Sequence, residues 1–202
     1  GVGRAIMLRL LEEAKDCTSV RLLQDAFNNV SFSLYAKLGF VARDIVPLLV
    51  SDDPRPQPSR SSARIRPMTA ADLDDVASLD TEITGLRRRR DFELLLGFGT
   101  HLVCERDGRI SGYLCRFSVG DTNRLGPAAA HDPEDLKALL HYAAQLPGPR
   151  AAQMRFPASQ DDLLRYAFEA GFVVSNIGTY MVKGQWRPFQ GAQIIAMFPE
   201  AL

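Results

Sequence analysis

An internal repeat constrains the fold of this chain more than any other sequence feature. Residues 39–50 and residues 171–182 share glycine, phenylalanine, valine, isoleucine and a final valine, at an offset of 132 positions. Each segment follows an amphipathic helical stretch, so the order of elements repeats together with the residues. Coincidence between two apolar strands is the alternative, and the shared order of elements argues against it. The repeat predicts two related units in tandem.

The composition is that of a packed globular protein with no preference for a charged partner. Apolar residues make up 46% of the 202 residues, and 24 basic residues balance 24 acidic ones. This balance favours neither nucleic acid nor an anionic membrane as a partner. The apolar runs are shorter than the roughly 20 residues that span a membrane, and we recognise no signal peptide. Three scattered cysteines fit neither a disulfide framework nor a zinc site, so we expect reduced thiols in a cytoplasmic protein.

A polar linker divides the chain into two parts. Residues 51–62 hold three prolines, four serines and no hydrophobic side chain, which is typical of an extended connection. We therefore expect a first unit over residues 1–50 and a second over 63–202. The first has helical periodicity at 4–15 and 28–37 and strand patterns at 19–24 and 39–50. Because the chain opens on Gly1 and runs directly into a helix, we expect this unit to be incomplete and N-terminally truncated.

The second unit has a fuller set of expected elements. A strand at 64–67 precedes a helix that Thr69 and Asp72 open as a capping box, followed by a helix at 87–96. The Asp107-Gly108 pair predicts a hairpin turn. The remaining expected elements are strands at 125–129, 153–156, 173–182 and 193–198 and helices at 132–145 and 160–170. The pattern predicts an α/β (α+β) fold, with mixed sheets flanked by helices in both units.

Two segments of the first unit carry candidate binding residues. The opening Gly-Val-Gly-Arg-Ala, from Gly1 to Ala5, places two glycines before a helix whose first amide groups lack intrahelical partners. Such a terminus binds anions, and a diphosphate is the physical candidate. The alternative is an ordinary turn or a cloning remnant. In the second segment Asn28 can cap a helix that Gly39 can end in a left-handed turn.

Together these segments resemble the GNAT superfamily of N-acetyltransferases, which use acetyl-CoA. In that family a glycine-rich loop holds the pyrophosphate, and an N-x-x-A/S-x-x-L-Y-x-K-x-G-F element forms the wall beside the thioester. The residues that match are Gly1 and Gly3 for the loop, and Asn28, Ser31, Leu34, Tyr35, Lys37, Gly39 and Phe40 for the second element. The resemblance implies that Tyr35 protonates the departing CoA thiolate, whereas the alternative for Tyr35 is a half-buried packing residue. It implies cofactor contacts from Gly1, Val2, Gly3, Arg4, Ala5, Asn28 and Ser31.

The second unit resembles the C-terminal domain of tandem GNAT proteins from bacteria, but its functional positions differ. At the loop position, Ala129 to Asp135 places carboxylates at a helix N-terminus, where they would repel phosphate. Gln160 stands at the asparagine position and Ala167 at the tyrosine position, so this unit has no acid there. We expect its neighbour Tyr166 to be a packing or surface residue.

Other polar clusters are weaker candidates. The run from Arg87 to Arg90 is either an anion site or, as we favour, a set of ion pairs with Asp80, Glu82, Asp91 or Glu93, because consecutive residues point around a helix. The histidines do not form a metal constellation, and we expect no metal.

The sequence thus predicts an acyltransferase that moves acetyl from acetyl-CoA to an amine, with part of the active site in this chain. The alternative is a noncatalytic GNAT-like module that selects substrates or dimerises. The residues do not distinguish a small-molecule amine from a peptide amine, and they leave a homo-oligomer open.

Overall fold

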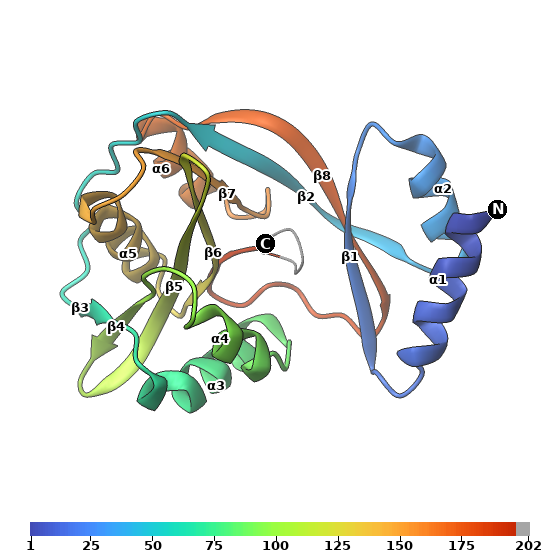
Figure 1. The fold of residues 1–202 in the computed structure, drawn as a ribbon, viewed down its shortest axis with the longest axis horizontal. Helices are drawn as coiled ribbons and strands as arrows, with labels where there is room; N and C mark the ends of the chain where they lie inside the picture. The colour runs from blue at the N-terminus through green and yellow to red at the C-terminus, as the bar shows by residue number, and fades with distance from the viewer. Residues whose placement is uncertain (197–202) are drawn as a thin grey trace.

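A single mixed sheet runs through the whole molecule. The computed structural model describes residues 1–196, and within them nine strands join in the order β1-β8-β2-β7-β6-β5-β4-β3, with β9 attached to β6. Neighbouring strands are antiparallel except for β6 and β7, which are parallel. Figure 1 shows two groups of elements joined by the long strands β2 and β8. This arrangement is the α/β fold predicted from the sequence.

The first group contains two helices and two strands. Their bounds are α1 (Val2–Glu13), β1 (Ser19–Asp25), α2 (Asn29–Lys37) and β2 (Val41–Ser51). The side chain of Asn28 accepts a hydrogen bond from the backbone N–H of Ser31 at 3.0 Å, and Gly39 follows α2 with a φ of 90°. Both observations confirm the predicted ends of this helix.

The second group contains the remaining elements. They are β3 (Arg64–Pro67), the short 3₁₀ helix η1 (Ala70–Asp72), α3 (Leu73–Thr84), α4 (Arg89–Leu95), β4 (Leu102–Arg106), β5 (Arg109–Val119), β6 (Thr122–Ala130), α5 (Pro133–Gln145), β7 (Ala151–Arg155), α6 (Asp161–Glu169), β8 (Val173–Gly184) and β9 (Ala192–Ile194). Asp107 and Gly108 have φ values of 51° and 74°, which confirms the hairpin turn. Of the strand expected over 193–198, Met197 and Phe198 lie outside the described residues.

The 132-residue repeat extends through four consecutive elements. At this offset α1, β1, α2 and β2 correspond to α5, β7, α6 and β8. The two long strands of the repeat pair with each other, and their register is symmetric under the exchange of the two copies. Exchange of the two copies turns the pair Val41–Val182 into the pair Val50–Val173. It also turns Arg43 into Ser175, and these are the two residues that the register shifts leave out. The repeat seen in the sequence is therefore a local two-fold symmetry of the fold.

Each unit contributes a strand to the other. β2 lies between β7 and β8, and β8 lies between β1 and β2. Leu49 of β2 is fully buried in the same hydrophobic cluster as Leu136 and Phe156 of the second unit. Pairing between distant strands leaves no local pattern, so this shared sheet could not be predicted from the sequence.

The linker is extended as predicted, but it is bound to the second unit. The backbone N–H of Arg55 donates to the carbonyl of Ala170 at 2.8 Å, and the Tyr166 hydroxyl donates to the carbonyl of Gln57 at 2.6 Å. The Ser61 hydroxyl donates to the carboxylate of Asp135. Backbone groups and serines, rather than apolar side chains, hold this segment in place.

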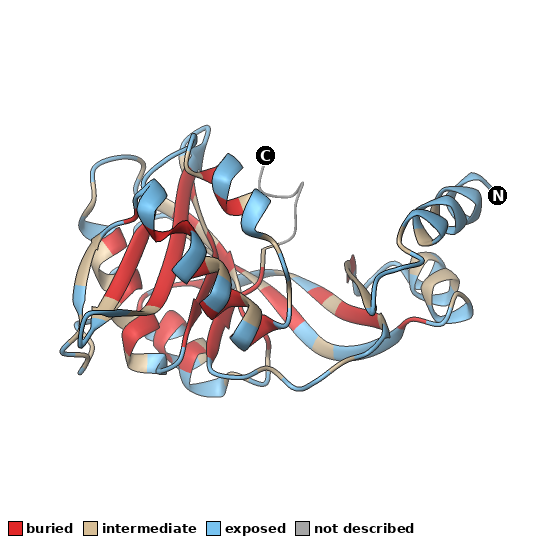
Figure 2. Ribbon diagram, turned by 90° about the horizontal axis from the view of Figure 1, so that it is seen from below, coloured by how far each residue is buried: buried red, intermediate tan, exposed pale blue. Residues whose placement is uncertain are grey.

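Burial is concentrated in the second unit (Figure 2). The helices α1 and α2 contain no buried residue, whereas α3, α5 and α6 each contribute several to the core. Apolar side chains such as Ile6, Leu10 and Val30 are exposed on the first unit. None of the described helices is long and apolar enough to cross a membrane.

Candidate functional site

The predicted phosphate-binding residues form the exposed start of α1. Gly1 is the N-cap of this helix, and no side chain caps its first turn, which contains no acidic residue. All five residues from Gly1 to Ala5 are exposed. A Cβ atom at Gly3 would lie 3.9 Å from the side chain of Leu34, so α1 packs beside α2 (Figure 1). No side chain of the first turn therefore competes with an anionic ligand for the amide groups of this turn.

The other predicted residues of the first unit lie on or next to α2. Asn28 uses its side chain as the helix cap, and the Ser31 hydroxyl donates to the Gln24 side chain at 2.9 Å. Tyr35 is half-buried, with its ring edge against Phe40 and the two ring centroids 6.1 Å apart. Because a Cβ atom at Gly3 would lie within van der Waals distance of Leu34, the start of α1 lies beside the turn of α2 that carries Tyr35.

The outer edge of β1 has no neighbouring strand among the described residues. Among the described residues β1 is the terminal strand of the sheet, with β8 on one edge. Its counterpart in the repeat, β7, has β6 as a parallel neighbour on the corresponding edge. The structure therefore shows which edge of β1 would face a partner strand.

In the second unit, carboxylates occupy the helix N-terminus that corresponds to the start of α1. The Asp132 side chain caps α5 by accepting from the backbone N–H of Glu134 at 2.9 Å. The Glu134 carboxylate accepts from the backbone N–H of Arg60 and from Lys137. This arrangement confirms the prediction that acidic side chains fill this helix start.

Asp135 makes the same helix start still less suitable for phosphate. Its carboxylate is buried and accepts hydrogen bonds from Ser61, Ser111 and Arg106. Burial alone would raise the pKa of Asp135, but these hydrogen bonds lower it. The group therefore stays negatively charged at neutral pH and disfavours a second anion nearby.

The strand β9 fills the wedge between β6 and β7. These two strands pair only over their first three residues, Thr122–Arg124 with Ala151–Gln153. Beyond that point β9 pairs with β6 from Ala128 to Ala130, and the N–H of Ile195 donates to the carbonyl of Arg155 on the other side at 2.8 Å. The wedge of the second unit is thus closed by the protein's own backbone.

Gln160 holds β9 in this position. Its side-chain oxygen accepts from the backbone N–H of Gln193 at 2.8 Å, and its nitrogen donates to the carbonyl of the same residue at 3.1 Å. By the repeat Gln160 corresponds to Asn28, so the counterpart of a predicted cofactor residue binds a strand here. Ala167, the counterpart of Tyr35, is fully buried and carries no proton donor.

The remaining clusters have structural roles. Arg88 pairs with the fully buried Asp80 at 2.7 Å, and Arg89 pairs with Asp74 and Glu93. The ion-pair interpretation of the arginine run is therefore confirmed for these two residues, although the Arg88 side chain is only 13% exposed rather than solvated. Tyr166 is a packing residue, as predicted. Within residues 1–196 no group of three His, Cys, Asp or Glu side chains could hold a metal ion.

A family model described as an acetyltransferase (GNAT) domain matches residues 76–196, which is more than half of the chain. No curated protein matches the sequence.

Several solved structures share the fold. A proposed acetyltransferase from Pyrococcus horikoshii is 21% identical with a TM-score of 0.74, covering 96% of this chain and 63% of that one. A GCN5-related N-acetyltransferase from Sphaerobacter thermophilus is 15% identical with a TM-score of 0.53, covering 82% of this chain and 59% of that one. A tandem GNAT protein from the clavulanic acid biosynthesis pathway is 16% identical with a TM-score of 0.56, covering 93% and 71%. The chain thus spans about three fifths of the length of the first two proteins.

We predict that Gln160→Ala loosens β9. The variant removes two hydrogen bonds that stabilise β9 by about 1 kcal/mol each. The amides of residues 192–195 should therefore exchange about 10-fold faster or more, while the exchange rates of β4 and β5 stay unchanged. Hydrogen exchange measured by NMR checks this.

Gln190→Ala is the matched control, because Gln190 is exposed and its side chain bonds only to the carbonyl of Pro188. Unchanged exchange at 192–195 in a folded Gln160→Ala variant would show that Gln160 does not hold the strand.

Proposed function

Because the chain belongs to the GNAT acetyltransferase family, we propose that it is part of an N-acetyltransferase that uses acetyl-CoA and an amine acceptor. The contrast between the two helix N-termini carries this proposal. The start of α1 is exposed and free of acidic residues, while the start of α5 is capped by Asp132 and carries Glu134 and Asp135. The first unit is therefore the one suited to a diphosphate.

In this proposal the backbone amides from Gly1 to Ala5 hold the diphosphate of CoA. Asn28 and Ser31, at the start of α2, line the extended arm. The amine nitrogen attacks the thioester carbonyl carbon, the carbon–sulfur bond breaks, and Tyr35 gives its proton to the departing thiolate. The excess proton on the new amide nitrogen leaves to water or to a base. Holding both reactants together removes much of the entropic part of the barrier.

The groove of the first unit needs a second wall. In the second unit β6 forms this wall beside β7. In the first unit the strand that corresponds to β6 would lie beside the outer edge of β1 and complete the groove. This strand comes from outside the described residues. The acceptor, whether a small molecule or a peptide amine, would then enter from the side of that strand.

The second unit fits a noncatalytic role within the same protein. Its wedge is filled by β9, its helix start is acidic, and Ala167 replaces the proton donor. These observations favour a module that selects substrates or supports dimerisation over a second acetyl-transfer site.

Calorimetric titration with acetyl-CoA tests the proposed cofactor site. Gly3→Asp places a carboxylate at the start of α1, where a Cβ has room, and should weaken binding by at least about 10-fold, or about 1.4 kcal/mol. Gly3→Asn, of similar size but uncharged, should bind more tightly than Gly3→Asp. Equal binding by both variants, or CoA-induced protection of amides 130–134, would contradict the assignment.

Tyr35→Phe tests the proposed acid in a longer form of the protein that transfers acetyl groups. Loss of the proton donor should lower kcat by about 100-fold while the dissociation constant for acetyl-CoA changes little. Tyr142→Phe, on α5, should retain full kcat. Full activity of Tyr35→Phe in steady-state assays would remove this residue from the mechanism.

A further inference from the structure

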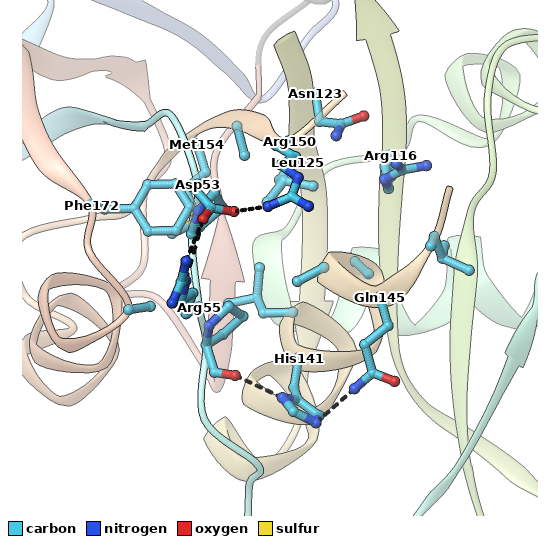
Figure 3. A pocket seen from close by; sticks show the side chains of 18 of the residues that line it. Asp53, Arg55, Arg116, Asn123, Leu125, His141, Gln145, Arg150, Met154 and Phe172 are labelled. Carbon is cyan, nitrogen blue, oxygen red and sulfur yellow. Dashed lines mark hydrogen bonds and ion pairs between the residues drawn. The ribbon is translucent and has the colours of Figure 1, made fainter. Parts of the chain in front are cut away.

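A cavity of about 420 Å³ lies in the second unit beneath the linker (Figure 3). It is bounded by α5, α6 and the first halves of β6 and β7, with residues 53–56 as its outer wall. β6 contributes Asn123 and Leu125 to the cavity, whereas β9 pairs with the same strand from Ala128 to Ala130. The cavity is therefore separate from the wedge that corresponds to the cofactor groove.

One part of the cavity wall is apolar. Leu125, Leu140, Met154 and Phe172 line it together with several buried alanines from α5, β7 and α6. Apolar surface of this kind contributes about 25 cal/mol per Å² when a ligand removes it from water. A volume of this size is within the range of small-molecule sites.

The alanines are specific to the second unit. Four wall positions that carry alanine have larger side chains at the corresponding places in the first unit, at the offset of 132 residues. The pairs are Ala143 with Leu11, Ala152 with Val20, Ala167 with Tyr35, and Ala170 with Leu38. Protein interiors are normally close-packed. Small residues at these four positions leave a space in the second unit that larger side chains would fill.

The polar part of the cavity is positively charged. Figure 3 shows Asp53 joined to both Arg55 and Arg150, at 2.8 and 3.4 Å. Arg116 also lines the cavity, is only 5% exposed and donates to the carbonyl of Pro147 at 2.9 Å. No carboxylate among residues 1–196 pairs with Arg116, and burial lowers its pKa. Three guanidinium groups thus face a single carboxylate.

We propose that this cavity binds a monocarboxylate with an apolar body, such as a medium-chain fatty acid or an arylalkanoate. The carboxylate pairs with Arg116 and Arg150, since guanidinium groups bind carboxylates bidentately. The apolar body lies against Leu140, Met154 and Phe172.

A polyanion such as CoA does not suit the same space. The turns of α5 that line it, from Leu140 to Gln145, are at the C-terminal end of the helix, where the helix dipole is negative. Near that end Arg116 and Arg150 can pair with one carboxylate, whereas the further charges of a polyanion would add to the negative end of the dipole. The second unit is then a ligand-binding module, whether or not the first unit transfers acetyl groups.

Titration of the full chain with octanoate and with phenylbutyrate, followed by NMR and calorimetry, tests the proposal. Both should shift the amide signals of residues around the cavity, and 1-octanol should bind at least 10-fold more weakly than octanoate. Arg116→Gln should weaken octanoate binding at least 10-fold, while the exposed Arg64→Gln leaves it unchanged.

Ala143→Leu, which installs the first unit's residue, tests the cavity independently of charge. The leucine side chain would fit into the existing cavity, so this variant should keep its melting temperature and lose octanoate binding. Ala36→Leu, on the exposed surface of α2, should bind octanoate as the unmodified chain does. The proposal is overturned if neither carboxylate binds at millimolar concentration, if octanol binds as tightly as octanoate, or if the folded Ala143→Leu variant binds as tightly as the unmodified chain.

Discussion

The antiparallel pairing of β2 with β8 is the interaction on which the rest of the structure depends. These strands are the corresponding elements of the two copies of the repeat, and each lies inside the half of the sheet that belongs to the other copy. The exposed helices α1 and α2 bury no residue, so the first unit has little core of its own. Small units of this kind bury too little surface to be stable alone. The shared sheet supplies the missing stabilisation, with Leu49 of β2 in the core of the second unit.

The same pairing explains the state of the second unit's groove. Because β8 has β1 on one edge and β2 on the other, the chain that follows it cannot pair beside it. β9 pairs instead with the part of β6 that β7 leaves unpaired. The side chain of Gln160 then holds β9 in the closed wedge through two hydrogen bonds to Gln193. The closed wedge of the second unit leaves the first unit as the proposed place for acetyl-CoA.

Local features were predictable from the sequence, and long-range ones were not. The Asn28 cap, the Asp107-Gly108 turn and the helix from Pro133 to Gln145 depend on neighbouring residues, so propensity and capping rules suffice. The insertion of β2 between β7 and β8 and the position of β9 depend on which distant edges are free, which no local pattern records. The cavity had a readable signal, since extending the repeat upstream from Gly39 places alanines opposite larger residues. It needed the structure to show that those positions face one space.

Native-state hydrogen exchange across the whole chain tests the central claim that one sheet unites the two units. We expect the amides of β2 and β8 to exchange only through global unfolding, with the same free energy of opening as the core strands β5 and β6, while α1 exchanges through local opening. The opposite result is that the amides of β2 exchange together with those of α1 and β1, with a free energy of opening distinctly lower than that of β5 and β6. That outcome would mean that the first unit unfolds on its own and that the shared sheet does not hold the molecule together.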